Sequence, residues 1–517
     1  MSVSSPIEIE ESSDDAFVIL IQNLSEENRR EGTQSTTERD FTCICRVPQN
    51  LAGICSRATE PELVSIGPYH RDKHEVRGFR MYKLEFLRSL LSRIQEPQSS
   101  LRRMCRAMKE LEYEARRRYS EPIDMSSDDF VQMMLLDGCF IIELFQQVCG
   151  SDDSTNANSL VFMKPWLIPI LIGDLLKLEN QLPFFVLERL SEYSIGNTEV
   201  SLVRQTEILG SVDEIFCPQD EISDSLDETF GSQANTSDPL VLQAFVLQAL
   251  KCFNLVLPRS LESFKYRRQL WRIEENYHLL HLFYRSYSLP KRSFANLSNT
   301  SERRWLPRLS YLSNLTNLYR RRSHESPRYR PLSDQSIPCV TRLRHAGVKF
   351  RRQKGSRGNF LHINFHEGVL QLPPMIINDF TSTILINCVA FEQCYPRPTW
   401  KYFSEYIAFM SCLLNSSRDV TFLCDKGIIS NFSYSDKRVA NLFKKLGEHV
   451  VFNVRECYLK NEFREVEAYY SSNWATLRRT YFSSPWSTIS AVSASFLLAL
   501  TAIQTIIAIL SYKVPHS

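Results

Sequence analysis

The sequence predicts a mainly α-helical protein with a small β-sheet or hairpin around residues 347–375 and one C-terminal transmembrane helix. Over most of the chain, apolar residues recur at the three- and four-residue steps of a helix. Strict alternation of apolar and polar residues is found around residues 361–365, as in a strand. The segment 489–511 has no charged residue and is almost wholly apolar or small. These observations divide the chain into an acidic, Ser-rich, disordered tail at 1–45, a helical body at 46–478, a membrane-proximal segment at 479–488, a transmembrane helix at 489–511 and a short tail at 512–517.

Composition excludes several classes of protein. The 517 residues include 61 Lys and Arg against 59 Asp and Glu, so no overall field favours nucleic acid, and no nucleic-acid partner is expected. The 14 cysteines are scattered without framework spacing, which is typical of reduced thiols in a cytosolic domain. Cys43 and Cys45 lack the gap and the second pair that a zinc site needs. The acidic start, MSVSSPIEIEESSDD, does not resemble a secretory signal.

The first half of the body contains two strongly patterned helices. The earlier one has an apolar face formed by residues three or four positions apart: Leu101, Cys105, Met108, Leu111, Ala115 and Tyr119. The second begins at Ser and Asp cap candidates at 126–129 and is then almost continuously apolar, which predicts a helix at the centre of the core. Cys139 lies in its middle and is predicted to be a packing residue and not a nucleophile.

The stretch DLLKLENQLPFFVLERL, at 174–190, is predicted to join two helices. Pro183 disfavours helical geometry at the residue before it, and apolar residues at helical spacing lie on both sides. Glu179, Asn180 and Gln181 fall at the break, where their side chains can pair with backbone groups that a broken helix leaves without partners. A catalytic role would need a second acid, base or nucleophile nearby.

Two insertions interrupt the body. The segment 195–240 is acidic and Ser-rich, and the segment 285–335 is rich in arginine. The basic segment is either a plain linker or a weak contact with anionic lipid. Beyond it, GVKFR and the alternation of Leu361, Ile363 and Phe365 before the turn HEG predict a β-hairpin, and helices return after residue 381.

The apolar segment 489–511 is long enough to cross a bilayer. Its 23 residues would span roughly 34 Å as a helix, against a hydrocarbon core of about 30 Å. Trp486 and Tyr512 suit the two interfaces, and Arg478 with Arg479 against the single Lys513 favours a cytosolic body. The alternative is a buried core helix.

No catalytic, cofactor or metal site is predicted. The sequence contains no P-loop, dinucleotide fingerprint, nucleophile elbow or kinase motif set. Glu275 and His278 have the Glu-x-x-His spacing of a di-iron site, but the motif occurs once where such a site needs it twice. His362 and His366 would need a third ligand and are predicted to be exposed hairpin residues.

Several blocks resemble one family. VSIGPYH, FVQMMLLDGCFIIELF, DLLKLENQLPFFVLERL, AGVKF, INCVAFEQC and PWSTISAVSASFLLALTAIQT occur in the order of the plant family called domain of unknown function 247, from about residue 45 to the C-terminus. The segment HRDKHEVRG departs from the simpler turn that is usual there. The matching family residues, taken as structural, are Gly67, Pro68, Tyr69, Asp137, Gly138, Cys139, Phe140, Glu179, Asn180, Gln181, Pro183, Phe184, Phe185, Phe391, Glu392, Pro485 and Trp486.

The resemblance implies a plant membrane protein with no established catalytic activity, from a family that in grasses is associated with self-incompatibility loci. Our first hypothesis is a non-enzymatic, membrane-anchored recognition or signalling protein that binds an unidentified protein partner. It would sit in the plasma membrane or an endomembrane, with the variable insertions as contact surfaces. The alternatives are a membrane-tethered enzyme of unrecognised class, which a pocket with convergent polar groups would favour, and a lipid binder that uses the basic segment.

Overall fold

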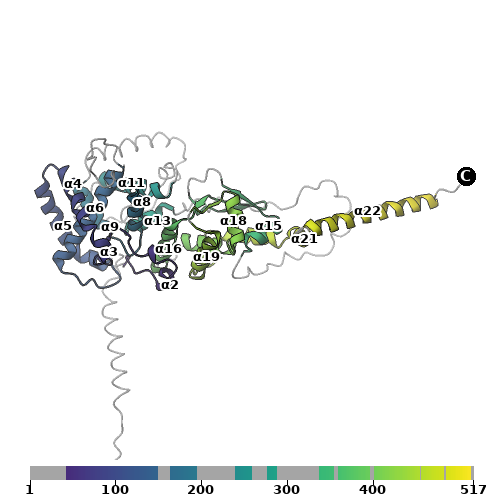
Figure 1. The fold of residues 1–517 in the computed structure, drawn as a ribbon, viewed down its shortest axis with the longest axis horizontal. Coiled ribbons are helices and arrows are strands. Elements are labelled where there is room, and N and C mark those ends of the chain that lie inside the picture. The colour runs from purple at the N-terminus through teal and green to yellow at the C-terminus, as the bar shows by residue number, and fades with distance from the viewer. Residues whose placement is uncertain are drawn as a thin grey trace, which may run out of the picture.

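The computed structural model describes residues 42–149, 164–194, 239–258, 276–287, 337–353, 359–395, 401–432, 434–454, 456–481 and 485–513. In this part of the chain the molecule is elongated, with a helical body at one end and a long projecting helix at the other (Figure 1). The body is mostly helical with two small sheets. The predicted fold class is therefore confirmed.

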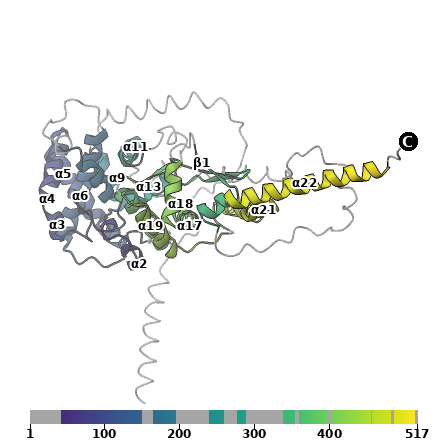
Figure 2. The same cartoon turned by 45° about the vertical axis from the view of Figure 1, so that its right-hand side comes forward.

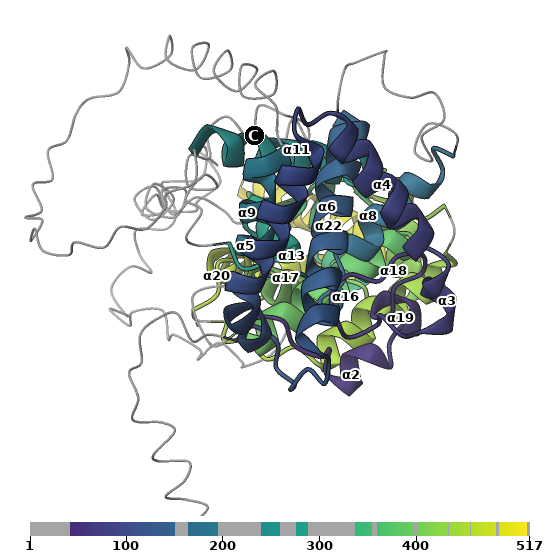
Figure 3. The same ribbon diagram turned by 90° about the vertical axis from the view of Figure 1, so that its left-hand side faces the viewer.

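The N-terminal half of the body is a set of helices around one buried helix, α6. Its members are α2 (Gln49–Ala52), η1 (Ser56–Ala58), α3 (His74–Arg77), α4 (Arg80–Ser92), α5 (Pro97–Arg117), α6 (Ser127–Cys149), α8 (Leu167–Leu175), α9 (Phe184–Ser194), α11 (Pro239–Val256) and α13 (Leu279–Tyr287). Helix α6 packs against α4, α5, α9 and α11. Viewed along the long axis, α4, α5 and α6 face the viewer and α22 lies behind them (Figure 3).

Helix α6 is central because its sequence is apolar on every side. Residues 130–147 are all buried except Gln132, which is exposed, as expected of a helix that is hydrophobic almost all round. The Ser126 hydroxyl accepts a hydrogen bond from the Asp129 backbone N–H at 3.2 Å and caps the helix. The predicted start and central position are thus confirmed.

The C-terminal half combines helices with the sheets. Its helices are α15 (Val340–His345), α16 (Asp379–Cys394), α17 (Tyr402–Leu413), α18 (Ser417–Asp425), α19 (Asp436–Glu448), α20 (Lys460–Tyr470) and α21 (Asn473–Tyr481). Helix α16 joins the two halves, because it contacts α8 and η1 on one side and α17 on the other. Figure 2 shows α17, α18 and α19 grouped between the N-terminal helices and α21.

The larger sheet has the order β1-β3-β2, formed by β1 (Lys349–Arg352), β2 (Asn364–His366) and β3 (Val369–Leu372). Strands β2 and β3 form the predicted hairpin, with Glu367 and Gly368 at positive φ (49° and 74°) in its two-residue turn. Strand β1 pairs with β3 in parallel. The ring of Tyr469 from α20 lies against the turn, since a Cβ on Gly368 would be 2.7 Å from that ring.

The structure differs from several expected boundaries. Leu361 and Ile363 precede β2 and are buried outside the strand. A second sheet pairs β4 (Met375–Ile376) with β5 (Ile429–Ser430), and β5 lies within a region predicted to be helical. Cys43 and Ile44, placed in the disordered tail, are buried in the core. Residues 285–287, assigned to the basic insertion, complete α13, while 195–238 and 288–336 lie outside the described residues.

Helix α22 (Pro485–Lys513) extends away from the body, as the yellow helix of Figure 1 shows. It begins at Pro485, and Trp486 next to it is exposed. The preceding helix α21 contacts both α22 and α15. The side chain of Arg478, on α21, lies so close to Gly347 that a Cβ there would be 3.0 Å from its Cδ.

Candidate functional site

The break between α8 and α9 holds a buried polar network. Asp174, at the end of α8, accepts hydrogen bonds from the backbone N–H groups of Glu62, Leu63 and Val64 at 2.8–3.0 Å. It also pairs with Lys177 at 2.9 Å, and both side chains are almost inaccessible to solvent. Residues 59–67 have no regular secondary structure, so their buried N–H groups depend on such side-chain partners.

Asn180 forms hydrogen bonds with the segment 59–67, and both Asn180 and Gln181 form hydrogen bonds with backbone groups at the break. Asn180 accepts from the Ile66 N–H at 2.6 Å and donates to the carbonyls of Val64 and Asp174. Gln181 donates to the carbonyls of Leu175 and Lys177, both at 2.7 Å. These contacts are with backbone groups, the pairing that the sequence predicted for the triplet.

Glu179 is the charged member of the triplet. Its carboxylate accepts from Arg46 at 2.8 Å and from the Val47 N–H at 2.9 Å, and it lies 3.2 Å from His70 Nε2. Burial acts to raise the pKa of Glu179, but the hydrogen bonds from His70, Arg46 and Val47 lower it to about 2. Glu179 is therefore an ionised partner that ties the N-terminal segment to the break.

A second buried pair lies beside this network. Asp137 on α6 accepts from Lys83 on α4 at 2.5 Å and from the Gly67 N–H at 2.9 Å. Burial raises the pKa of Asp137, although the Lys83 charge acts in the opposite direction. Gly67 has a φ of +72°, and a Cβ there would be 2.5 Å from the Gln181 carbonyl oxygen. The next residues, Pro68 and Tyr69, are half-buried, with the Arg46 guanidinium 4.0 Å from the Tyr69 ring centroid.

The remaining family residues of the N-terminal half are packing residues. Cys139 is fully buried, which raises the pKa of its thiol to about 12 and disfavours a nucleophilic role. Phe140 contacts Phe79 and Phe86 edge to face. Gly138 faces Leu190 of α9, whose Cδ1 would be 2.3 Å from an added Cβ. Pro183 precedes α9 and is buried, as is Phe184, while Phe185 is half-buried.

Phe391 and Glu392 lie apart from that network, on α16. Glu392 accepts from Tyr284 Oη at 2.5 Å and from the N–H groups of Phe403 and Ser404, at 2.8 and 2.7 Å, in the first turn of α17. Burial raises the pKa of Glu392 to about 7, although these hydrogen bonds act to lower it. Phe391 is buried beside His278, whereas Glu275 is outside the described residues.

Replacing Glu392 with glutamine is expected to remove part of the pH dependence of stability. A carboxyl whose pKa is higher in the folded state, here about 7 against 4.5, favours folding fully below the lower value. That contribution is lost as the pH rises through about 7. Urea unfolding at about pH 5 and about pH 8 checks this. The free energy of unfolding of E392Q, taken relative to wild type at the same pH, should be larger at the higher pH than at the lower one. The exposed control Glu110→Gln should not, and a constant difference for E392Q would contradict the assignment.

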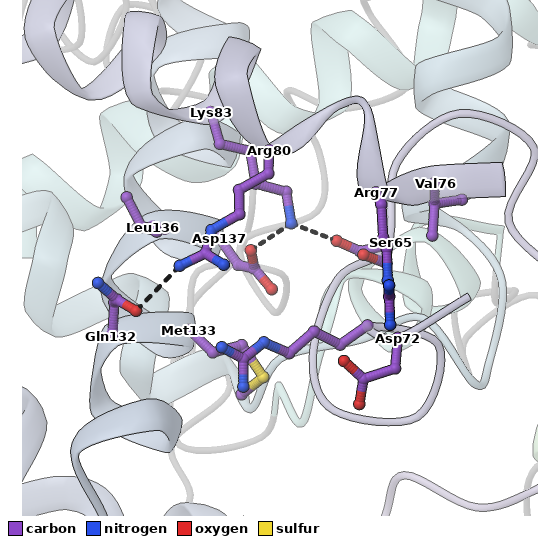
Figure 4. Close-up of a pocket in the computed structure, with 11 residues that line it drawn as sticks. Ser65, Asp72, Val76, Arg77, Arg80, Lys83, Gln132, Met133, Leu136 and Asp137 are labelled. Carbon is purple, nitrogen blue, oxygen red and sulfur yellow. Dashed lines mark hydrogen bonds and ion pairs between the residues drawn. The ribbon is translucent and has the colours of Figure 1, made fainter. Parts of the chain in front are cut away.

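A cavity opens beside the Lys83–Asp137 pair. It has a volume of about 370 Å³ and is lined by Ser65, Arg71, Asp72, Val76, Arg77, Arg80, Lys83, Gln132, Met133, Leu136 and Asp137. These residues come from the segment on both sides of Gly67 and from α3, α4 and α6, and Figure 4 shows them around one hollow. Four side chains in the lining are cationic and two are anionic. The cavity therefore has the size of a small-ligand site with an excess of positive charge.

Some polar groups of the cavity lining are already engaged with one another. Its amine, Lys83, is held by Asp137 and by the Ser65 carbonyl, both at 2.5 Å. The lining contains no His or Cys that could pair with a nucleophile. Within the described residues no cluster of three or more His, Cys, Asp or Glu could hold a metal ion. His362 and His366 are both exposed.

The structure brings some of the predicted site residues together and not others. Gly67, Asp137 and the triplet at 179–181 meet in one network, while Glu392 and Trp486 lie elsewhere. Sequence reasoning missed the partners Arg46, Lys83 and Asp174, and also the cavity. The signal for the cavity was the segment HRDKHEVRG, which supplies Arg71, Asp72, Val76 and Arg77 to its lining.

Comparison with known proteins agrees with the block pattern. A family model described as a plant protein of unknown function matches residues 44–500. The chain is 30% identical over 482 residues to UPF0481 protein At3g47200 of Arabidopsis thaliana, covering 92% of this chain and 87% of that protein. It is 24% identical over 508 residues to the putative UPF0481 protein At3g02645 of Arabidopsis thaliana, covering 89% of each. No solved structure matches. The resemblance is thus confirmed, and the chain belongs to the plant family called domain of unknown function 247.

Proposed function

We propose that this chain is a single-pass membrane protein whose helical body binds another protein, in recognition or signalling, without catalysing a reaction. Recognition of the self-incompatibility type is one form that the family resemblance suggests. The observation that carries the membrane part is α22, a long apolar helix that projects from the body (Figure 1). The plasma membrane and the endomembranes are both compatible with such an anchor.

Comparison with α6 supports this role for α22. Both helices are long and apolar enough to span a bilayer, but 89% of the α6 window is buried in the body, against 0% of Val492–Ile509. Phe496, Leu497 and Leu498 are among the exposed large side chains of α22. Such a surface is unfavourable in water and favourable in lipid. The alternative of a buried core helix would require this surface to be covered by another part of the chain or by a partner.

The proposal of recognition without catalysis rests on the polar groups of the body. The polar network at the α8–α9 break binds backbone groups, and the lining of the cavity has no nucleophile paired with a base. We place the partner surface on the variable insertions, because loops on a rigid scaffold can vary without loss of the core. The basic segment 285–335 would add a weak contact with anionic lipid.

Membrane topology is the experiment that tests the anchor. In plant microsomes we expect the chain to resist carbonate extraction, protease to digest the body, and a glycosidase to leave its mobility unchanged. The seven sequons are at Asn23, Asn235, Asn296, Asn299, Asn314, Asn415 and Asn431. Asn415 is exposed, so Asn415→Gln identifies glycan there if the body is lumenal. A chain released by carbonate would overturn the anchor, and a protected, glycosylated body would overturn the cytosolic orientation.

Two cysteines provide an independent readout of the compartment. Cys149 at the end of α6 and Cys252 on α11 have their sulfur atoms 3.2 Å apart, close enough to oxidise to a disulfide in a secretory compartment. In a cytosolic body both thiols should react with maleimide after denaturation without reductant, and mass spectrometry should find both labelled. A loss of label that reductant restores would place the body on the oxidising side.

The membrane-tethered enzyme remains the second candidate function, because a cavity with convergent polar groups is present. Its carboxyl Asp137 has a raised pKa through burial, yet it is engaged by Lys83. If this pair were catalytic, Asp137→Asn in a correctly folded chain would abolish a turnover that the wild type shows. The recognition hypothesis expects no such turnover.

A further inference from the structure

The cavity beside α3, α4 and α6 is lined by arginine side chains whose N–H donors are only partly occupied by contacts within the described residues. No hydrogen bond or ion pair is found between Arg77 and another described residue. Arg80 makes one hydrogen bond, to Gln132 at 3.2 Å. Arg71 shares its charge with the exposed Asp129 at 3.4 Å. Three guanidinium groups therefore border the same hollow with donors to spare (Figure 4).

The interior of the cavity does not cancel this positive charge. Lys83 and Asp137 form a buried pair that neutralises itself. Asp72 is the other acid of the lining, so it faces three arginines. Val76, Met133 and Leu136 are buried and supply an apolar wall. The cavity thus combines an apolar side with a cationic rim.

We propose that this cavity binds a small, soluble organic phosphate. Guanidinium groups bind phosphate oxygens through paired N–H donors, and they remain charged at any physiological pH. A phosphate ester carries close to two negative charges at neutral pH. Three arginines and one acid give a net charge of two positive units, so a phosphate ester balances the cavity better than a ligand with a single carboxylate. The volume of about 370 Å³ has room for an organic body beside the apolar wall.

The position of the cavity favours a soluble source over a lipid head group. Helices α3 and α4 lie at the end of the body opposite to α22 (Figures 1 and 2). If α22 spans the membrane, as proposed above, the cavity lies at the end of the body that is distant from that membrane. This part of the inference rests on the proposed anchor, whereas the binding of phosphate does not.

The test is calorimetric titration of the full chain in phosphatidylcholine nanodiscs with inorganic phosphate, pyrophosphate and acetate. We expect saturable binding of pyrophosphate that weakens as chloride is raised, and weaker binding of acetate. Arg77→Gln and Arg80→Gln should each weaken pyrophosphate binding by about tenfold, since each removes a charged donor. Asp72→Asn should strengthen it, because it removes the unpaired acid from the rim.

The matched control is Arg88→Gln, an exposed arginine on α4 outside the cavity lining. It loses the same charge and should bind pyrophosphate like the wild type. Circular dichroism melting confirms that each variant is folded. The absence of saturable binding by the folded wild type, or equal loss in the Arg88→Gln variant, would overturn the site.

The source of the phosphate is tested by adding phosphatidylinositol 4-phosphate to the same nanodiscs. Unchanged pyrophosphate binding supports a soluble ligand. Competition by the lipid would overturn the soluble source, and the cavity would then be a head-group site. Because the topology experiment uses microsomes and a different readout, failure of the anchor and failure of the cavity are distinguishable.

Discussion

Replacing Asp174 with alanine is expected to destabilise the body by about 3–5 kcal/mol, because the change removes the close partner of a buried charge. Lys177, which is almost fully inaccessible to solvent, would lose its close carboxylate partner at 2.9 Å and keep only Glu62 at 3.7 Å. The N–H groups of Glu62, Leu63 and Val64 would lose their acceptor as well. Urea unfolding of the full chain in detergent, followed by far-ultraviolet circular dichroism, measures the difference.

Two further variants separate the loss of this buried carboxylate from the effect of removing any carboxylate. Asp128→Ala removes an exposed carboxylate from the first turn of α6 and should change stability by less than about 0.5 kcal/mol. Lys177→Met in the Asp174→Ala background removes the stranded charge and should restore part of the stability. If Asp174→Ala costs no more than Asp128→Ala, the network does not hold the segment 59–67.

Replacing Gly67 with alanine is expected to cost about 3 kcal/mol or more, the sum of left-handed backbone strain and overpacking. The added Cβ would be 2.5 Å from the Gln181 carbonyl oxygen, which is backbone and cannot swing aside. The Tyr119 hydroxyl, which donates to that same oxygen at 3.0 Å, would also be crowded. Differential scanning calorimetry should show a clearly lower melting temperature than wild type.

Gly78→Ala is the matched control for this prediction. Gly78 follows α3 in ordinary helical geometry, and a Cβ there would meet nothing within 4 Å. Its replacement should be neutral or stabilise by up to about 1 kcal/mol, since alanine restricts the unfolded chain. Equal melting temperatures for the two variants would show that the backbone around Gly67 can move aside.

The sequence predicted the helices well where periodicity was long and strong. Helix α6 and the break at 174–190 both lie where their apolar patterns placed them. The turn of the hairpin was predicted because Glu367–Gly368 is a local signal. The parallel pairing of β1 with β3, and the two-residue strands β4 and β5, could not be predicted, since they depend on contacts between distant segments.

The candidate site was predicted only in part, for a similar reason. The triplet at 179–181 was recognised as backbone-pairing because its neighbour Pro183 breaks the helix. Its partners in the segment 59–67 are more than 100 residues away in the chain, and no local pattern identifies them. Lys83 and Arg80 have the appearance of ordinary exposed helix residues in the sequence. Only the fold shows that one is buried against Asp137 and that the other borders a cavity.

The contacts of Tyr469 and Arg478 have a mechanical consequence. Tyr469 lies against the hairpin turn at Gly368, and Arg478 lies against Gly347 just before β1, so α20 and α21 are both braced on the sheet. Helix α21 in turn contacts α22. If α22 spans a membrane, as proposed, a tilt of this helix would be transmitted through α21 to the sheet, and the body would keep a fixed orientation to the membrane surface.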